Sequence, residues 1–172
     1  MLNDKWKQRV QHWAKELFFM AIIIVIVSNT VSLLRSPDIK DKNLPDIATI
    51  LTNEELFSTQ DFADRPVLIH FWATWCPTCK IEAANIQEIS DSYNVLTIAV
   101  KSGSDKEINT FLKDNDLDYN VINDAQGVLA QDFSVQAYPT TFIYNKDNKL
   151  SFTEVGYTST WGLKLRMWWA GL

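Results

Sequence analysis

The longest apolar run of the chain lies near its N-terminus. It covers residues 17–34, reads LFFMAIIIVIVSNTVSLL and contains no charged residue. At about 1.5 Å per residue, a helix of this length just crosses the hydrocarbon core of a bilayer. Residues 17–27 also lack the polar stripe that a core helix shows. We expect a transmembrane signal anchor over residues 17–34. A cleaved signal peptide and a buried core helix are the alternatives.

Charged and aromatic residues around this run suggest its orientation. Four basic residues precede it and three follow closely, a slight bias that favours a cytoplasmic segment over residues 1–16. Trp6 and Trp13 suit the inner headgroup level of the membrane, although a solvated tail is an equal alternative. We therefore expect residues 36–172 to lie outside the cytoplasm, on the periplasmic side of a bacterial inner membrane, where disulfides persist.

The hydrophobic pattern changes its period several times after a polar, proline-containing linker over residues 35–45. Nearly continuous apolar runs predict buried strands, and spacings of three and four residues predict helices. Turn residues at 145–149 separate the last two strands, as in a hairpin. The expected elements are strands at 67–72 and 95–100, helices at 79–93 and 105–115, strands at 140–144 and 150–155, and a helix at 160–170. Residues 46–172 thus read as an α/β domain, a mixed sheet with helices on both faces.

Composition narrows the possible functions. The chain has 172 residues and a net charge of −5, which argues against a nucleic-acid binder because phosphate contacts need a basic surface. Its two Cys and two His cannot by themselves complete a Cys₄ or Cys₃His zinc site.

The chemically informative segment covers residues 71–80 and reads FWATWCPTCK. A strand is expected to end here and a helix to begin at Cys76, where free backbone N–H groups and the helix dipole favour a thiolate. Pro77 falls at the first helical position, where its missing N–H costs nothing. Cys79 lies three residues on, within reach of Cys76. We expect Cys76 to be the attacking nucleophile and Cys79 the resolving thiol.

These residues resemble the thioredoxin superfamily. The WATWCPTCK segment at 72–80 is similar to the family signature, closest to its membrane-tethered, extracytoplasmic TlpA-like branch. Tyr138-Pro139-Thr140 matches the place where the family keeps a cis-proline facing the cysteine pair. The segments at 155–157 and 161–166 look like the copper-sensitivity-suppressor type of protein disulfide oxidoreductase.

The resemblance implies a thioredoxin fold and thiol–disulfide exchange with protein substrates. No cofactor is expected, because the cysteine pair itself carries two electrons. The implied partners are protein thiols and disulfides and a membrane electron-transfer protein, with no nucleic acid, and the protein is expected to be a monomer. The expected catalytic residues are Cys76, Cys79 and Glu82, and the expected substrate-binding residues are Trp75, Pro77, Thr78, Tyr138, Pro139 and Thr140.

One departure from the family concerns proton transfer. Cytoplasmic thioredoxins carry a buried Asp at the position of His70, and this chain lacks it. Glu82, three residues after Cys79, is a hypothetical replacement that takes the proton of the resolving thiol. The alternative is a solvated acid in the first turns of the helix, favourable only through the helix dipole. His70 itself is more readily interpreted as a hydrogen-bonded core histidine than as a metal ligand.

Several alternatives stay open. The cysteine pair could form half of a metal site or an inert structural disulfide, and the protein could be a reductant for cytochrome c maturation or a non-redox metal-handling protein. The direction of electron flow does not follow from the sequence. Core packing is the default interpretation for Trp161, Leu165, Trp168 and Trp169, with a membrane-facing or partner-facing patch as the alternative.

Overall fold

The chain forms two compact units, Met1–Leu34 and Arg35–Leu172. The computed structural model describes residues 2–35, 37, 42–62 and 64–172. The first unit is formed by helix α1, Leu2–Arg35, which includes the whole apolar run over 17–34. Within the described part of the chain, no helix combines the length and the hydrophobicity that a membrane crossing requires.

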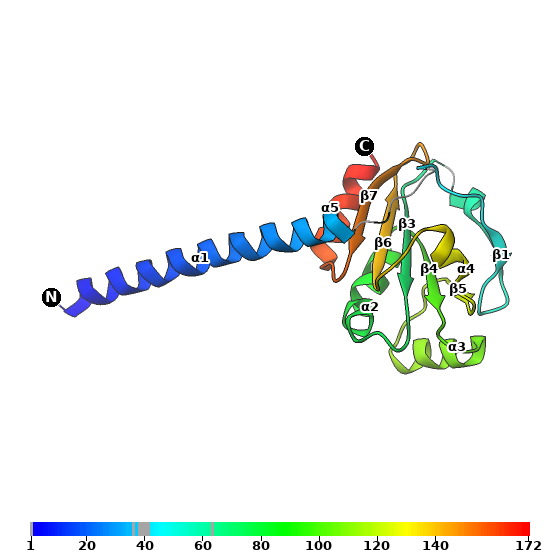
Figure 1. Cartoon of the computed structure of the whole chain (residues 1–172), viewed down its shortest axis with the longest axis horizontal. Coiled ribbons are helices and arrows are strands. Elements are labelled where there is room, and N and C mark those ends of the chain that lie inside the picture. The colour runs from blue at the N-terminus through cyan, green and yellow to red at the C-terminus, as the bar shows by residue number, and fades with distance from the viewer. Residues whose placement is uncertain (1, 36, 38–41, 63) are drawn as a thin grey trace. The chain divides into compact units, whose positions relative to one another are not determined.

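A five-stranded mixed sheet with the order β5-β4-β3-β6-β7 forms the centre of the second unit (Figure 1). The central strand β3 pairs in parallel with β4 and antiparallel with β6, and all six of its residues are buried. This burial on both faces explains its continuous apolar sequence. The strands are β3 (Val67–Trp72), β4 (Asn94–Val100), β5 (Val121–Asp124), β6 (Thr140–Tyr144) and β7 (Leu150–Val155).

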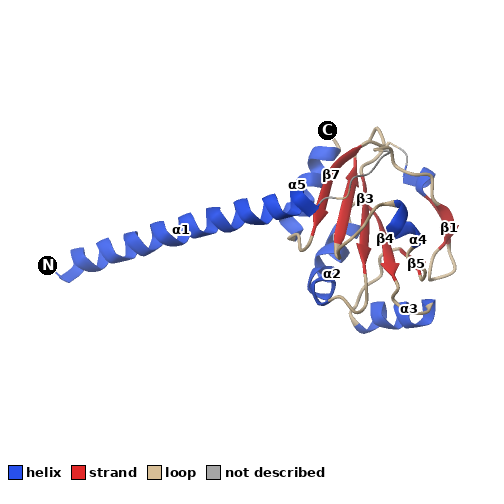
Figure 2. Ribbon diagram, viewed as in Figure 1, coloured by secondary structure: helices blue, strands red, loops and turns tan. Residues whose placement is uncertain are grey.

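Helices cover both faces of this sheet, as the sequence predicted (Figure 2). One core joins the sheet to α2 (Pro77–Ser90), α3 (Asp105–Asp114) and α5 (Thr160–Ala170). The other core joins it to α4 (Val128–Asp132) and to a small hairpin of β1 (Ala48–Ile50) and β2 (Leu56–Ser58), which leads into the short 3-10 helix η1 (Thr59–Phe62). The sheet and its two helical layers form a thioredoxin fold.

The elements predicted from periodicity are present, with small shifts at their ends. The first helix begins at Pro77 and ends at Ser90, whereas the sequence predicted residues 79–93. The pattern missed β1, β2, β5 and α4, each of three to five residues. Segments this short do not complete the two helical turns or the alternation from which a period is recognised.

The prediction for the last helix was wrong about its buried side. Trp161, Leu165, Trp168 and Trp169 are exposed, and Leu163, Met167 and Ala170 face the core instead. Both sides of α5 are apolar, so periodicity could not identify the buried one. The core side carries the slimmer side chains, which allow α5 to pack against α2 and β6.

The chain enters the domain beside the turn between β6 and β7. The linker was expected over 35–45, and residues 36 and 38–41 of it lie outside the described residues. The backbone before Pro45 is attached to the turn by two hydrogen bonds, Leu44 N to Asn148 O and Leu150 N to Lys42 O, both 2.7 Å, and by a bridge between Asn43 and Lys149.

The two sides of α5 should differ sharply in their contribution to stability. Leu163→Ala removes a fully buried side chain and should lower the free energy of unfolding by about 3 kcal/mol. Leu165→Ala, on the exposed side of the same helix, should change it by less than about 0.5 kcal/mol. Urea unfolding followed by circular dichroism measures both. Equal losses would contradict the assignment of the buried side.

Candidate active site

The cysteine pair lies where β3 leads into α2. Cys76 is the N-cap residue of α2, with extended backbone angles, and its Sγ accepts a hydrogen bond of 3.2 Å from the N–H of Cys79. Pro77 occupies the first helical position, as predicted. The two cysteines are joined by a disulfide. Cys76 Sγ therefore lies at the positive end of the α2 dipole, beside a backbone N–H that stabilises a thiolate.

The two sulfurs differ in their surroundings. Cys76 is 5% exposed and Cys79 is 2% exposed, so Cys76 is the more accessible of the pair, as expected. Cys76 Sγ lies 3.7 Å from the carbonyl oxygen of Tyr138. The Tyr138–Pro139 peptide bond is cis, which confirms the expectation drawn from the resemblance. The hydroxyl of Thr140 is buried and donates to the carbonyl of Ala137 at 2.8 Å.

The surface around Cys76 is partly aromatic. Trp75 is exposed, its ring meets that of Tyr138 edge to face with 5.6 Å between centroids, and its Nε1 donates to the carbonyl of Lys101 at 3.1 Å. Pro77 is exposed and Thr78 half-buried beside it. Trp72, in contrast, belongs to the core, as the sequence indicated. Tyr138 thus lies beside the Cys76 sulfur with Trp75 against it, whereas Pro139 and Thr140 are buried.

Glu82 is a buried acid rather than a solvated one. Its side chain has no exposed surface, and it lies about one turn of α2 beyond Cys79. The Thr158 N–H donates to its Oε1 at 2.9 Å, whereas Oε2 has no hydrogen-bond partner among the described residues. Burial raises the pKa of Glu82 to about 8, the Thr158 hydrogen bond opposes this shift, and the negative charge of Glu154 adds to it.

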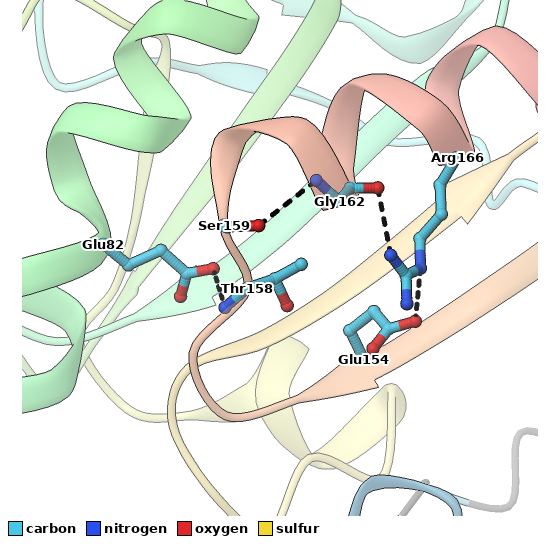
Figure 3. A network of polar contacts seen from close by, with 6 residues as sticks. All are labelled: Glu82, Glu154, Thr158, Ser159, Gly162 and Arg166. Carbon is cyan, nitrogen blue, oxygen red and sulfur yellow. Dashed lines mark hydrogen bonds and ion pairs between the residues drawn. The ribbon is translucent and has the colours of Figure 1, made fainter. Parts of the chain in front are cut away.

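Sequence reasoning did not identify the residues that surround Glu82. Figure 3 shows that the Glu82–Thr158 contact lies at the entry to α5, with the ion pair of Arg166 and Glu154 close by. Arg166 Nε contacts Glu154 Oε1 at 2.6 Å and its Nη1 donates to the carbonyl of Gly162 at 3.0 Å. These residues come from β7 and α5, more than 70 positions after Glu82, so no local spacing marked them.

His70 is a core histidine, as interpreted from its strand. It is buried, its Nδ1 lies 2.8 Å from the Thr141 hydroxyl, and burial lowers its pKa to about 3. The ring is therefore neutral at ordinary pH, and its low pKa makes it a weak acceptor for a thiol proton. No cluster of three or more His, Cys, Asp or Glu residues suited to a metal ion occurs in the part of the chain that the structure describes.

Comparisons with known proteins agree with this geometry. Residues 39–163 match the redoxin family model. A thioredoxin-like protein of Haemophilus influenzae is 26% identical over 94% of this chain and 97% of its own length. The thiol-disulfide oxidoreductase ResA of Bacillus cereus is 28% identical over 78% of this chain and 84% of its own. The crystal structure of a secreted thiol-disulfide isomerase from Corynebacterium glutamicum superposes with a TM-score of 0.68 and 26% identity, covering 74% of this chain and 84% of that one.

The buried Glu82 should make stability depend on pH. Its pKa is about 8 in the folded state, against 4.5 for the same group free in water. The contribution of its burial to stability is therefore complete below pH 4.5 and is lost as the pH rises through 8. In the disulfide form, Glu82→Gln should gain stability relative to the unmodified protein between pH 5 and 8, by up to about 4 kcal/mol.

Urea denaturation across this pH range measures the difference. Glu88→Gln, on an exposed part of the same helix, is the matched control and should follow the unmodified protein. If the curve of Glu82→Gln also ran parallel to that of the unmodified protein, the raised pKa would be wrong.

Proposed function

Since the chain belongs to the redoxin family and is a protein thiol–disulfide oxidoreductase, we propose that it exchanges disulfides with protein substrates through Cys76 and Cys79, outside the cytoplasm and anchored in the inner membrane. One observation carries the assignment of roles. Cys76 Sγ lies at the start of α2, accepts the Cys79 N–H and belongs to the more exposed of the two cysteines. The sulfur that meets a substrate is therefore also the one held at the positive end of the helix.

The exchange proceeds in two displacements. In the reducing direction, the Cys76 thiolate attacks a substrate disulfide, forms a mixed disulfide and releases one substrate sulfur as a thiolate, which takes up a proton. Cys79 then loses its proton and attacks Cys76, which releases the second substrate thiol and forms the Cys76–Cys79 disulfide. Two electrons pass to the substrate, and the opposite direction reverses both steps.

Glu82 is proposed as the group that accepts the Cys79 proton. It lies about one helical turn from Cys79, its carboxyl group is buried and its Oε2 is free to accept. A pKa of about 8 is close to that of an ordinary thiol, so a proton moves between the two groups at little cost in free energy. His70 offers no comparable route, because its lowered pKa makes it a weak proton acceptor.

Substrates are proposed to dock where Tyr138 meets Cys76. The Tyr138 carbonyl is 3.7 Å from Cys76 Sγ, and Trp75 stands beside it. An extended substrate segment that runs along this backbone brings its own sulfur next to Cys76. Pro77 and Thr78 complete this docking surface, whereas Pro139 and Thr140 are buried and are proposed to shape the backbone beneath it.

The anchor proposal rests on the N-terminal sequence. The uncharged run over 17–34 is long enough to span a bilayer, and the basic residues before it favour a cytoplasmic segment at 1–16. With the linker over 35–45, the thioredoxin-like domain of residues 46–172 then lies in the periplasm. A membrane electron-transfer protein is the proposed redox partner.

Two physiological tasks are compatible with this reaction, that of a reductant and that of an oxidant. A reduction potential near about −270 mV would indicate a reductant, as in cytochrome c maturation, and one near about −120 mV an oxidant. The copper-sensitivity-suppressor type is proposed on the C-terminal segments at 155–157 and 161–166. Equilibration with glutathione measures the potential directly.

Single cysteine variants test the two roles. Cys79→Ser should accumulate mixed disulfides with substrate proteins, because nothing resolves the bond that Cys76 forms. Cys76→Ser should trap none, because Cys79 is the less accessible sulfur. Non-reducing electrophoresis after acid quenching measures the adducts. Trapping by Cys76→Ser alone would reverse the roles, and activity retained in both variants would favour a non-redox function.

Glu82→Gln tests the proton acceptor. Loss of a positioned base should slow resolution of the mixed disulfide on the order of 100-fold at pH 8 and abolish the rise in rate between pH 6 and 9. Glu88→Gln should leave both unchanged, since Glu88 is exposed and pairs with Lys164. Single-turnover kinetics with a disulfide peptide measures the profile. An unchanged rate of Glu82→Gln between pH 6 and 9 would remove Glu82 from the mechanism.

A further inference from the structure

The outer side of α5 carries an apolar surface that nothing in the described chain covers. We call it the α5 apolar face. Its members follow helical spacing and are 56 to 82% exposed, while the opposite side of the helix is buried. The face consists of Trp161, Leu165, Trp168, Trp169 and Leu172. Three tryptophans on one short helix exceed the scattered single apolar residues that a soluble surface normally shows.

The charges along the edges of this face are already paired. Lys164 contacts Glu88 at 2.5 Å and lies 5.9 Å above the ring of Trp161. Arg166 is paired with Glu154 on the other edge. At the C-terminal end, a hollow of about 350 Å³ has Arg65 in its lining together with Trp168 and Leu172. The face is thus apolar and aromatic, the two acids at its edges, Glu88 and Glu154, are each paired with a cation, and Arg65 lies at one end.

The turn between β6 and β7 contacts both the linker and the C-terminal end of α5. The backbone of residues 42–44 is attached to the β6–β7 turn. Lys146, in this turn, donates its backbone N–H to the Ala170 carbonyl at 3.3 Å and its Nζ to the Leu172 carbonyl at 2.6 Å. From Leu34 to Lys42 the chain spans at most about 28 Å when fully extended. Only a short stretch of chain therefore joins the end of the apolar run to the turn that contacts the end of α5.

The redox site lies at the other end of the sheet. Tyr144, the last residue of β6, pairs with Val67, the first residue of β3, whereas Cys76 lies just beyond Trp72, the last residue of β3. β3 has six residues, so about 20 Å of strand separates the linker's point of attachment from the cysteine pair. Figure 2 shows the β6–β7 turn and the start of α2 at opposite ends of the sheet. The C-terminal members of the face, Trp168, Trp169 and Leu172, lie near the linker and can therefore be occupied while Cys76 stays open.

We propose that the α5 apolar face binds the lipid surface of the membrane that holds the anchor, and that this contact orients the domain. The proposal rests on the membrane anchoring proposed above. Tryptophan is enriched at the bilayer interface, where its apolar ring and polar N–H are both accommodated, and Arg65 suits a phosphate headgroup. The short linker keeps the face at a high effective concentration near the bilayer, so a weak intrinsic affinity suffices.

Fluorine NMR of the full chain in nanodiscs tests this contact. The protein is labelled with 5-fluorotryptophan, and the discs contain phosphatidylethanolamine and phosphatidylglycerol, with or without a headgroup-chelated gadolinium lipid. The signals of Trp161, Trp168 and Trp169 should lose intensity with gadolinium. Trp6 and Trp13 report on the anchor, and Trp72, buried against Phe111 of α3, is the internal control that should keep its signal.

A matched pair of variants locates the contact. Trp168→Gln combined with Trp169→Gln should restore most of the Trp161 signal, because two of the interfacial side chains are gone. Leu56→Gln, which removes an 87% exposed leucine on β2, should leave the Trp161 loss unchanged.

The remaining outcomes separate the two proposals. Loss at Trp6 and Trp13 alone would overturn docking but keep the anchor, and loss at none of the five would overturn both. Loss at Trp72 as well would show contact without the proposed orientation. Shifts of the α5 signals that depend on the number of chains per disc, without gadolinium loss, would identify an interface between copies and overturn the lipid assignment.

Discussion

The hydrogen bond from the Cys79 N–H to Cys76 Sγ is the contact on which the chemistry of this domain depends. It exists because β3 is fully buried and delivers the chain to the start of α2 in one fixed position. Cys76 thereby replaces the usual Ser, Thr, Asp or Asn as the N-cap residue. A sulfur in this position accepts a backbone N–H and the positive end of a dipole together, and both favour the thiolate state.

The buried Glu82 lowers the stability of the folded domain when it is ionised. A carboxyl group with one hydrogen bond and no exposed surface is costly to ionise, and the negative charge of Glu154 increases that cost. The Arg166–Glu154 pair limits the increase, and the Thr158 N–H stabilises the anion directly. The residues around Glu82 of α2 come from β7, the entry to α5 and α5 itself, so the packing of α5 against α2 affects the protonation of Glu82.

The sequence predicted a structural feature correctly wherever that feature depends on neighbouring residues of a single segment. Val67 to Trp72 predicted a buried strand, and the order Cys76-Pro77 predicted a helix start, because each depends on neighbouring residues. The cis peptide bond before Pro139 was predicted only from the family resemblance, because the local residue pattern does not require it. Burial of Glu82 depends on Thr158 and on α5, which spacing along α2 cannot reveal. For α5, two apolar sides left Trp161 and Leu163 equally plausible as core residues, and only packing against α2 and β6 distinguished them.

The two sides of α5 therefore serve different purposes in one short helix. Leu163 and Met167 on the inner side pack α5 into the core, directly after the loop whose Thr158 N–H binds Glu82. The outer side carries the tryptophans that we propose to contact the membrane, and its C-terminal end lies beside the turn that holds the linker. A freely tumbling domain would present Cys76 in every direction. A domain held by both its linker and α5 would present Cys76 in only a narrow range of orientations. With the proposed redox partner in the same membrane, that restriction would raise the frequency of productive encounters without any change in the sulfur chemistry.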